Sequence, residues 1–353
     1  MSRVASGIET VRRVADRFAI SAPARSVVPF GRGHINETFL VSTGPVSTGP
    51  EEHVDEYVVQ RLNRAVFAEP GPLMDNVVLV SDRLGGRFVP EPVATRAGGW
   101  VVHDRGEAWR AWHRVARAET IDAATPQQAA SAAHLLGCFH GALAGLDPAL
   151  VHETLPRFHD PPRRLADLRR IVATDPRGRV VGVEAEIEAA FAAAPLAQMA
   201  RDLGERVPVR VAHNDAKLDN VLFRDGEAVC LVDLDTIMPT AWFWDVGDLL
   251  RTASTRVVED DARTERAVAD PERYQAVIDG YRSGISSAAT LESAEIEALK
   301  HAGAIVTYEQ ALRFLTDWIA GDVYYATTRP GQNLDRARNQ LHLLASMPGT
   351  VRA

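Results

Sequence analysis

The residues best suited to chemistry lie in one polar loop in the second half of the chain. This loop, HNDAKLDN at 213–220, lies between two apolar runs at 207–212 and 228–233 that have the length of short buried strands. An Asp-Gly pair at 225–226, between apolar residues, predicts a β-hairpin turn. We therefore expect the hairpin to bring Asp233, at the end of the second run, close to the polar loop.

These side chains match the needs of phosphoryl transfer from a nucleotide, a reaction that depends on positioning and charge neutralisation. Asp215 could orient an acceptor hydroxyl and take its proton, and Lys217 could reach the γ-phosphate of ATP. Asn220 and Asp233 offer the oxygen atoms that Mg²⁺ prefers as ligands. A simple turn, in which Asp and Asn cap backbone groups, would not account for an Asp-Lys-Asn set facing an acidic strand end.

The order His-x-Asp-x-Lys-x-x-Asn, followed by an apolar residue and Asp, is the signature of kinase-fold enzymes. The chain resembles the aminoglycoside phosphotransferase and choline kinase superfamily of small-molecule kinases, and within it the bacterial N-acetylhexosamine 1-kinases. The matching stretches are GRGHINETFLV at 31–41, YVVQRLNRAVF at 57–67, HNDAKLDNVLF at 213–223, LVDLDTIMP at 231–239, WDVGDLLR at 244–251 and RFLTDWIAGDVYY at 313–325.

The resemblance implies a two-lobed, protein-kinase-like α+β fold. Residues 1–118 would form a nucleotide-binding lobe, an antiparallel sheet with a helix. Residues 119–353 would form a mostly helical lobe that carries the catalytic hairpin and binds the acceptor. The cofactors would be ATP and Mg²⁺. The segment after Asp233 is too short for the activation segment of a protein kinase, so a small-molecule acceptor is expected.

By the same resemblance, a glycine-containing turn between strands expected at 27–30 and 37–41 would bind the nucleotide. Such a turn lets backbone amides approach phosphates closely, although an ordinary hairpin turn is the alternative interpretation. The residues that this turn would offer are Gly31, Gly33, His34, Asn36 and Thr38.

Arg61, on the strand expected at 57–62, lies where kinase-fold enzymes usually place a phosphate-binding lysine. Arginine can pair with phosphate bidentately, but its geometry differs from that of lysine. Asp75, on a helix expected at 72–84, is a candidate partner for it. The alternative interpretation is a surface arginine at the end of a strand.

The resemblance also assigns residues around the hairpin. His213 and Asp245 would support the catalytic loop, and Asp235 would bind sugar or metal. Arg313 would donate hydrogen bonds to a sugar hydroxyl, a task that suits a guanidinium, and Tyr324 is a further candidate for the same pocket. The alternative for Arg313 is a set of surface ion pairs, because Glu309 and Asp317 lie four residues to either side.

The composition of the 353-residue chain excludes some partners. Lys and Arg number 39 against 47 acidic residues, a formal charge of −8, and no basic stripe interleaves with aromatic residues, so nucleic-acid binding is not expected. No apolar run is long enough to span a membrane and no secretory signal is recognisable, so a cytoplasmic location is expected. The two cysteines, Cys138 and Cys230, lie in apolar surroundings, which favours buried free thiols.

Apolar periodicity predicts further helices, at 8–19, 127–146, 164–172, 183–203 and 295–319. Together with the resemblance, the sequence favours ATP-dependent phosphorylation of the anomeric hydroxyl of an N-acetylhexosamine (GlcNAc or GalNAc) to a sugar 1-phosphate. The first alternative is a related kinase for an aminoglycoside, an amino alcohol or a sugar 6-hydroxyl. The second is a non-catalytic kinase fold that binds only nucleotide or sugar.

Overall fold

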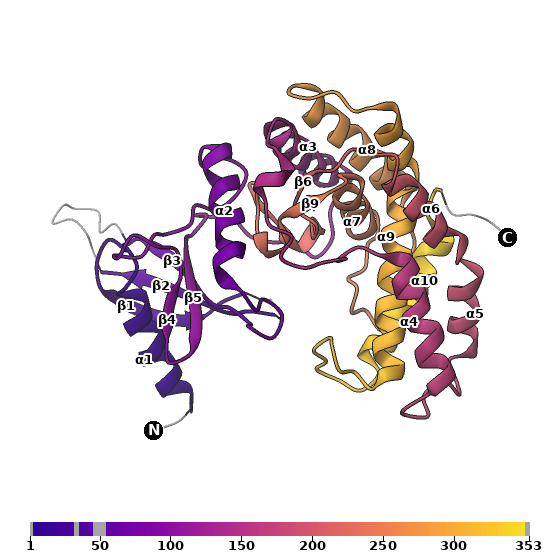
Figure 1. Ribbon diagram of the computed structural model, residues 1–353, viewed down its shortest axis with the longest axis horizontal. Coiled ribbons are helices and arrows are strands. Elements are labelled where there is room, and N and C mark those ends of the chain that lie inside the picture. Colours follow the sequence, from indigo (N-terminus) through magenta and orange to yellow (C-terminus); the bar gives the residue numbers. More distant parts are fainter. Residues whose placement is uncertain (1–2, 32–34, 45–53, 350–353) are drawn as a thin grey trace. The chain divides into compact units, whose positions relative to one another are not determined.

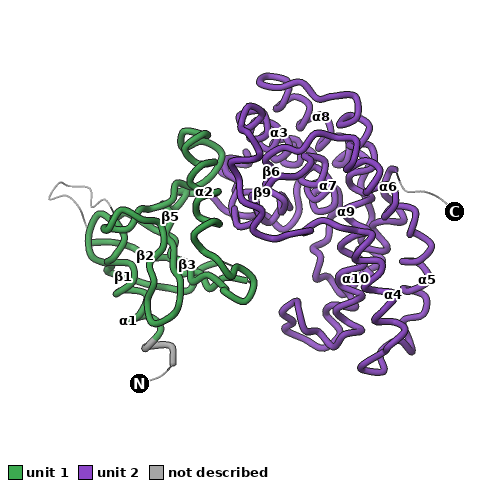
Figure 2. The backbone as a smooth tube through the Cα atoms, viewed as in Figure 1, with its two compact units in different colours: residues 1–117 green, residues 118–353 purple. Residues whose placement is uncertain are grey.

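The computed structural model describes residues 3–31, 35–44 and 54–349 (Figure 1). The chain divides into two compact units, residues 1–117 and residues 118–353 (Figure 2). Within the described residues, no helix is both long enough and apolar enough to cross a membrane.

Unit 1 is built on a five-stranded sheet in which neighbouring strands are antiparallel. The strand order is β1-β2-β3-β5-β4. The strands are β1 (Ala24–Pro29), β2 (Glu37–Thr43), β3 (Glu56–Arg61), β4 (Val102–Asp104) and β5 (Glu107–His113). Two helices accompany the sheet, α1 (Arg3–Ala15) and α2 (Pro70–Leu84). Helix α1 ends before the predicted limit at residue 19.

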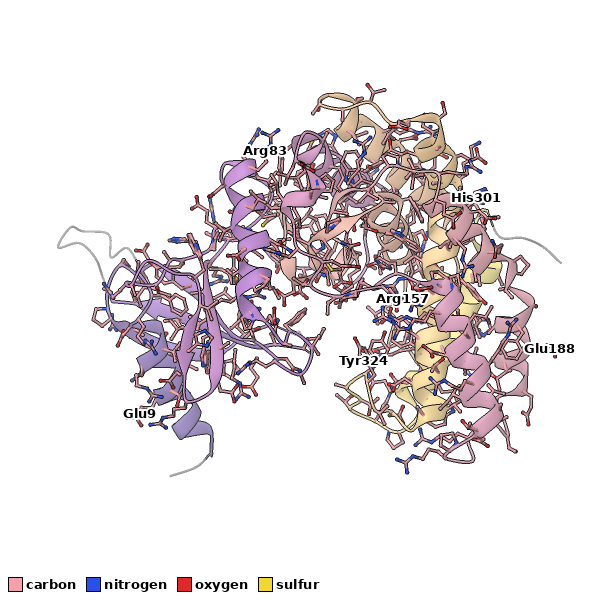
Figure 3. The ribbon with its side chains drawn as sticks, viewed as in Figure 1. Glu9, Arg83, Arg157, Glu188, His301 and Tyr324 are labelled. Carbon is pink, nitrogen blue, oxygen red and sulfur yellow. The ribbon has the colours of Figure 1, made fainter. Side chains whose placement is uncertain are left out.

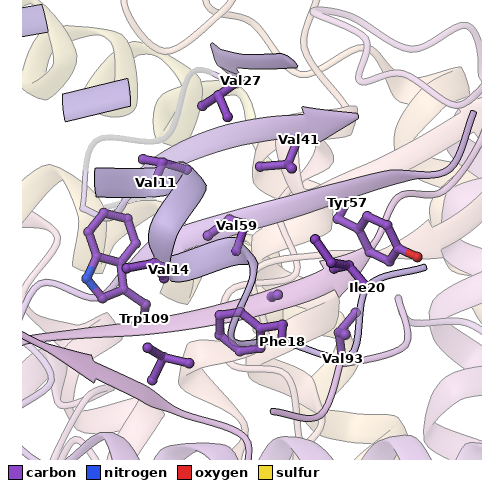
Figure 4. Close-up of a cluster of buried hydrophobic side chains, with 13 residues drawn as sticks. Val11, Val14, Phe18, Ile20, Val27, Val41, Tyr57, Val59, Val93 and Trp109 are labelled. Atoms are coloured by element: carbon purple, nitrogen blue, oxygen red, sulfur yellow. The ribbon is translucent and has the colours of Figure 1, made fainter. Parts of the chain in front are cut away.

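The core of unit 1 lies between α1 and one face of the sheet (Figure 4). Val11 and Val14 of α1 are buried with Tyr57 and Val59 of β3 and with Trp109 of β5. Because successive side chains of a strand point to opposite faces, Gln60 of β3 faces away from this core. The sheet therefore has one apolar face and one face that carries polar side chains.

Unit 2 is mostly helical. Its helices are α3 (Pro126–Leu143), α4 (Pro161–Thr174), α5 (Glu184–Ala192), α6 (Pro195–Gly204), α7 (Phe243–Ala253), α8 (Pro271–Ser286), α9 (Ser293–Ala320) and α10 (Gln332–Ser346). Two small antiparallel sheets complete it: β6 (Arg210–Ala212) pairs with β9 (Met238–Thr240), and β7 (Val221–Arg224) pairs with β8 (Glu227–Leu231). The single helix predicted at 183–203 is wrong: Pro195 begins a new helix, because proline is favoured in a first helical turn and disfavoured in a helix interior.

Close helix packing places α7 against α9. A Cβ atom at Gly247 of α7 would lie 2.5 Å from the carbonyl oxygen of Ala302 and 2.6 Å from Cγ2 of Val306, both on α9. Only glycine allows this approach. Asp245 lies two residues earlier on α7, so this packing also fixes the position of its carboxylate.

The two cysteines are free thiols. Cys230 on β8 is buried as predicted, and burial raises its pKa to about 12. Cys138 on α3 is half-buried.

Candidate active site

The predicted hairpin forms and brings the polar residues of the loop together. Asp225 and Gly226 both adopt positive φ, 51° and 86°, as a tight turn between β7 and β8 requires. At the other end of the hairpin, the backbone N–H of Val232 donates to the carbonyl oxygen of Asn220 at 2.9 Å. Asp233 follows Val232 directly, so Asn220 and Asp233 lie next to each other at the open end of the hairpin.

Asp215, Lys217 and Asn220 form one hydrogen-bonded group. Oδ2 of Asp215 accepts from Nζ of Lys217 at 3.1 Å and from Nδ2 of Asn220 at 2.8 Å. Nδ2 of Asn220 also donates to the carbonyl oxygen of Asp215 at 2.8 Å. Because the amide nitrogen of Asn220 makes both bonds, its amide oxygen is the atom that can face a cation.

The charges of this group reinforce one another. Burial alone would raise the pKa of Asp215, but the charges of Lys217 and His213 and the two hydrogen bonds outweigh it, and the pKa falls below its ordinary value. Burial would lower the pKa of Lys217, but the carboxylates of Asp215 and Asp233 outweigh it and raise that pKa. At neutral pH the loop therefore presents a carboxylate beside an ammonium group.

Asp245 braces the backbone in front of Asp215. Its Oδ2 accepts from the backbone N–H of His213 at 2.8 Å, and its Oδ1 accepts from that of Asn214 at 2.6 Å. His140 of α3 is fully buried and contacts Oδ2 through Nε2 at 2.8 Å. The Nδ1 atom of His140 lies 3.0 Å from the hydroxyl of Tyr281.

This arrangement sets the protonation of the pair. Burial lowers the pKa of His140, so the ring is neutral, with the proton on Nε2 donated to Asp245 and the hydroxyl of Tyr281 donating to Nδ1. Burial alone would raise the pKa of Asp245, but the hydrogen bonds from the ring of His140 and from the backbone of His213 outweigh it and lower that pKa. A buried carboxylate thus holds two backbone N–H groups of the loop.

His213 connects the loop to the strand end that carries Asp233. Its Nε2 lies 3.0 Å from the carbonyl oxygen of Val232, and its Nδ1 lies 3.3 Å from the backbone nitrogen of Asp215. The hydroxyl of Thr236 donates to the carbonyl oxygen of His213 at 2.7 Å. Asp235 lies in the same segment, in the short 3₁₀-helix Leu234–Thr236, and is buried.

The donor set fits a magnesium ion shared with nucleotide phosphates. Among the described residues, no group of three or more His, Cys, Asp or Glu side chains is arranged to hold a metal. Mg²⁺ bound beside phosphates is usually held by one or two protein oxygens rather than by a full protein cage. The amide oxygen of Asn220 and the adjacent carboxylate of Asp233 meet that description.

Arg313 of α9 lies among aromatic rings. Its guanidinium carbon is 5.5 Å from the ring centre of Phe158, 5.5 Å from that of Tyr325 and 6.0 Å from that of Tyr324. Burial would lower its pKa, but the nearby Tyr325, Glu309, Tyr324 and Asp215 raise it, so the group stays charged. Arg313 is therefore close enough to Asp215 for their charges to interact.

The interpretation of Arg313 as a member of surface ion pairs is wrong, because Glu309 and Asp317 are both buried. The carboxylate of Asp317 accepts from the backbone N–H groups of Val323, Tyr324 and Tyr325 at 2.8 to 2.9 Å. It thereby fixes the loop after α9, on which the exposed side chain of Tyr324 lies (Figure 3).

The residues expected to bind nucleotide lie in unit 1. Gly31 has a positive φ of 81°, whereas Gly33 and His34 lie outside the described residues. The side-chain oxygen of Asn36 accepts from the backbone N–H of Asn63 at 3.0 Å, and the hydroxyl of Thr38 accepts from Nε2 of Gln60 at 3.1 Å.

Arg61 forms ion pairs with Glu37 and, at 3.5 Å, with Glu107. The sequence offered Asp75 as a candidate partner for Arg61, but the ion pairs that Arg61 forms are with these two glutamates. The neighbouring Gln60 faces the opposite side of the sheet, where its Oε1 accepts from Nε of Arg110 at 2.9 Å and from Nε1 of Trp112 at 3.0 Å. The prediction from the sequence missed Arg110, although its position between apolar residues in the strand EAWRAWH was a signal for it.

Comparison with known proteins places this site in a family. The model of the phosphotransferase enzyme family matches residues 26–281. An aminoglycoside phosphotransferase from Alicyclobacillus acidocaldarius has a TM-score of 0.59 at 17% identity, over 95% of this chain and 94% of that one. An amicoumacin kinase, solved with AMP-PNP, Ca²⁺ and Ami, has a TM-score of 0.63 at 15% identity, over 99% and 98%. A choline/ethanolamine kinase family protein from Mesorhizobium loti has a TM-score of 0.54 at 15% identity, over 96% and 98%.

These similarities confirm the α+β, protein-kinase-like fold predicted from the sequence. The family match covers well over half of the chain and includes the whole segment from the polar loop at 213–220 to Asp233. The chain belongs to the phosphotransferase enzyme family.

Proposed function

We propose that the protein transfers the γ-phosphoryl group of ATP to the anomeric hydroxyl of an N-acetylhexosamine and so produces a sugar 1-phosphate. Membership of the phosphotransferase family makes it a kinase that acts on a hydroxyl group with ATP and Mg²⁺. The identity of the acceptor is the new part of the proposal. The observation that supports this acceptor is the position of Arg313, which lies among aromatic rings near the loop that contains Asp215.

Each polar residue of the loop has a separate role in the proposed reaction. The ionised carboxylate of Asp215 accepts a hydrogen bond from the acceptor hydroxyl and receives its proton as the oxygen bonds to phosphorus. Lys217 binds an oxygen of the γ-phosphate. Asn220 and Asp233 hold Mg²⁺, which when bound neutralises charge on the phosphates. His213 and Asp245 keep the loop backbone in place.

We assign nucleotide binding to residues 1–118 and acceptor binding to residues 119–353. In the first segment the proposed contacts are Gly31, Gly33, His34, Asn36, Thr38 and Arg61. Arg61 would exchange its partners Glu37 and Glu107 for phosphate oxygens, an exchange that its half-exposed position allows.

The acceptor site suits a neutral sugar. A guanidinium can donate two parallel hydrogen bonds to neighbouring hydroxyl groups, and aromatic rings pack well against the apolar face of a sugar ring. Tyr324 and Asp235 are the further candidates for sugar hydroxyls.

The charge near Asp215 argues against a polycationic acceptor. Arg164 of α4 is half-buried, and its pKa is lowered by burial and by the nearby charge of Arg313. Two guanidinium groups in this region repel an aminoglycoside, which would need an acidic site. A neutral N-acetylhexosamine meets no such repulsion. A non-catalytic role is disfavoured because the loop retains Asp215, Lys217 and Asn220 in one hydrogen-bonded group.

The experiment is a coupled ADP-release assay with Mg-ATP and a panel of acceptors: N-acetylglucosamine, N-acetylgalactosamine, glucosamine, glucose, choline and kanamycin. Phosphorus NMR of the product identifies the phosphorylated oxygen. We expect turnover on an N-acetylated hexosamine and an anomeric phosphate. Turnover on choline or kanamycin alone would overturn the acceptor assignment and leave the catalytic loop assignment intact.

A further inference from the structure

A further buried histidine, His159, contacts the backbone of the loop at 213–220 directly, at Asn214. Nε2 of His159 lies 3.1 Å from the carbonyl oxygen of Asn214, and Nδ1 lies 2.8 Å from Oε2 of Glu309 on α9. The side chains of His159 and Glu309 are only 6% and 1% exposed. The imidazole stacks on the ring of Trp244, with ring centres 4.6 Å apart and planes 4° apart.

The partners of His159 determine its protonation. A backbone carbonyl can only accept a hydrogen bond, and so can an ionised carboxylate. Glu309 is ionised: burial would raise its pKa, but the hydrogen bond to His159, the charge of Arg313 and the hydrogen bond from the backbone of Asp160 lower it. Its other oxygen, Oε1, accepts from the backbone N–H of Asp160 at 2.7 Å. Both ring nitrogens of His159 therefore donate, and both carry a proton.

His140 provides the contrast within the same site. One of its nitrogens faces a hydroxyl, on Tyr281, which can donate to it, so His140 needs only one proton. His159 has no such donor among the partners of its two nitrogens. His140 thus acts on the loop only through Asp245 and as a neutral ring, whereas His159 contacts the loop directly.

Asn214 is held on both sides of its backbone. Its N–H donates to Asp245 at 2.6 Å and its carbonyl oxygen accepts from His159 at 3.1 Å. Its φ of +66° lies in the left-handed region, which asparagine adopts more readily than most residues. Asp215 is the next residue, so a rotation of the peptide that joins them would redirect its carboxylate.

We infer that His159 and Glu309 are positioning residues for phosphoryl transfer: His159, protonated on both nitrogens and held by Glu309, fixes the Asn214 carbonyl and so the direction of Asp215. This inference rests on the proposed role of Asp215. Glu309 precedes Arg313 by one turn of α9, so the pair also joins the loop to the proposed acceptor site. The charged groups near the pair are Arg313 on α9, Arg164 on α4 and Asp215 on the loop.

Two substitutions at one position separate the two hydrogen bonds. In His159→Gln the amide nitrogen takes the place of Nε2 and can still donate to Asn214, whereas in His159→Asn it takes the place of Nδ1 and can donate only to Glu309. Both variants lose the stacking on Trp244. We expect His159→Asn to lower kcat about 100-fold, because a small misplacement of a reacting group costs that much. His159→Gln should keep most of kcat, and the KM for ATP should change little in either.

His342→Gln, at an exposed histidine of α10, is the matched control and should behave as wild type. Thermal melts identify variants that are merely unfolded. Equal kcat for His159→Asn, His159→Gln and wild type, or equal losses in the two variants, would overturn the inference.

A spectroscopic test does not depend on turnover. In ¹⁵N-histidine-labelled protein near neutral pH, we expect both ring nitrogens of His159 to show the shifts of protonated nitrogen. Glu309→Gln should convert the ring to its neutral form, since a glutamine has one acceptor oxygen for the two donors of His159 and Asp160. Glu188→Gln, an exposed position on α5, should leave the spectrum unchanged (Figure 3).

A non-protonated nitrogen on wild-type His159 would contradict the inference. Loss of activity in Asp215→Asn with normal kcat in His159→Asn would reject the positioning role alone. Normal activity in Asp215→Asn would instead reject the proposed mechanism.

Discussion

Oδ1 of Asp245 lies 2.6 Å from the backbone nitrogen of Asn214, and this is one of the contacts that join helix α7 to the loop at 213–220. A helix is rigid, whereas a loop of eight residues is not, so the carboxylate transfers the position of α7 to the residue in front of Asp215. His140 and Gly247 both serve this contact, the first by a hydrogen bond and the second by allowing α7 to pack closely on α9.

Removal of this carboxylate charge should weaken both the fold and the reaction. In Asp245→Asn the amide nitrogen faces groups that are themselves donors. We expect the free energy of unfolding to fall by about 3 kcal/mol, the scale of a lost charged hydrogen bond with a buried donor left unpaired. kcat should fall far more than the KM for ATP changes. Urea unfolding and steady-state kinetics measure the two effects, with Glu188→Gln as the control, and an unaltered kcat would contradict the bracing role.

The same pair should make stability depend on pH. The pKa values of His140 and Asp245 are both lowered in the folded protein. The unfolded chain then binds more protons, so the stability from each group is complete above its unfolded pKa and is lost as the pH falls through its folded pKa. We expect Tm to fall below about pH 6.5, the ordinary pKa of histidine.

Substitution of His140 tests this dependence. His140→Gln should have a lower Tm at neutral pH and a shallower fall of Tm on acidification, whereas His342→Gln should keep the wild-type slope. Melting curves across the acid range supply the measurement. The same slope in His140→Gln and wild type would show that His140 is not the group responsible.

Gly247 should tolerate no side chain. In Gly247→Ala the new Cβ would lie 2.5 Å from a backbone oxygen of α9, so the two helices must move apart. We expect a loss of about 1 to 3 kcal/mol in the free energy of unfolding, typical of overpacking. Gly71→Ala on α2, where nothing lies within 4 Å of the new atom, is the control and should not destabilise the protein. Equal melting temperatures for the two variants would contradict the close packing.

Arg313 should act on the acceptor and not on the nucleotide. In Arg313→Ala we expect the KM for the acceptor sugar to rise about 10- to 100-fold, the equivalent of one or two charged hydrogen bonds, with an unchanged KM for ATP. Arg282→Ala, at an exposed position on α8, is the control. A larger effect on the KM for ATP than on that for the sugar would place Arg313 in a different role.

The sequence predicted the elements whose cause is local. The turn at Asp225 and Gly226 follows from the two residues themselves, and the spacing of Asp215, Lys217 and Asn220 places them on one short loop. The helices formed where apolar periodicity indicated them, except that α1 ends at Ala15 and that Pro195 divides one helix in two.

The parts that the sequence did not reveal depend on contacts between distant residues. His140 and Asp245 are 105 residues apart, and His159 and Glu309 are 150 residues apart. Nothing in the spacing of such pairs distinguishes a partnered histidine from one that merely packs. The same limit explains the wrong interpretation of Glu309 and Asp317, since helical spacing shows which residues share a face but not whether that face is buried.

The measurement that tests the central claim most directly is the rate of phosphoryl transfer by Asp215→Asn, compared with wild type in single-turnover reactions on the accepted sugar. Asparagine preserves the shape of the side chain and removes its capacity to take a proton. We predict a rate lower by a factor of about 10² to 10⁴, the usual contribution of a positioned base, with ATP binding retained. A near-normal rate in Asp215→Asn would contradict the account, because the loop would then owe its chemistry to another residue.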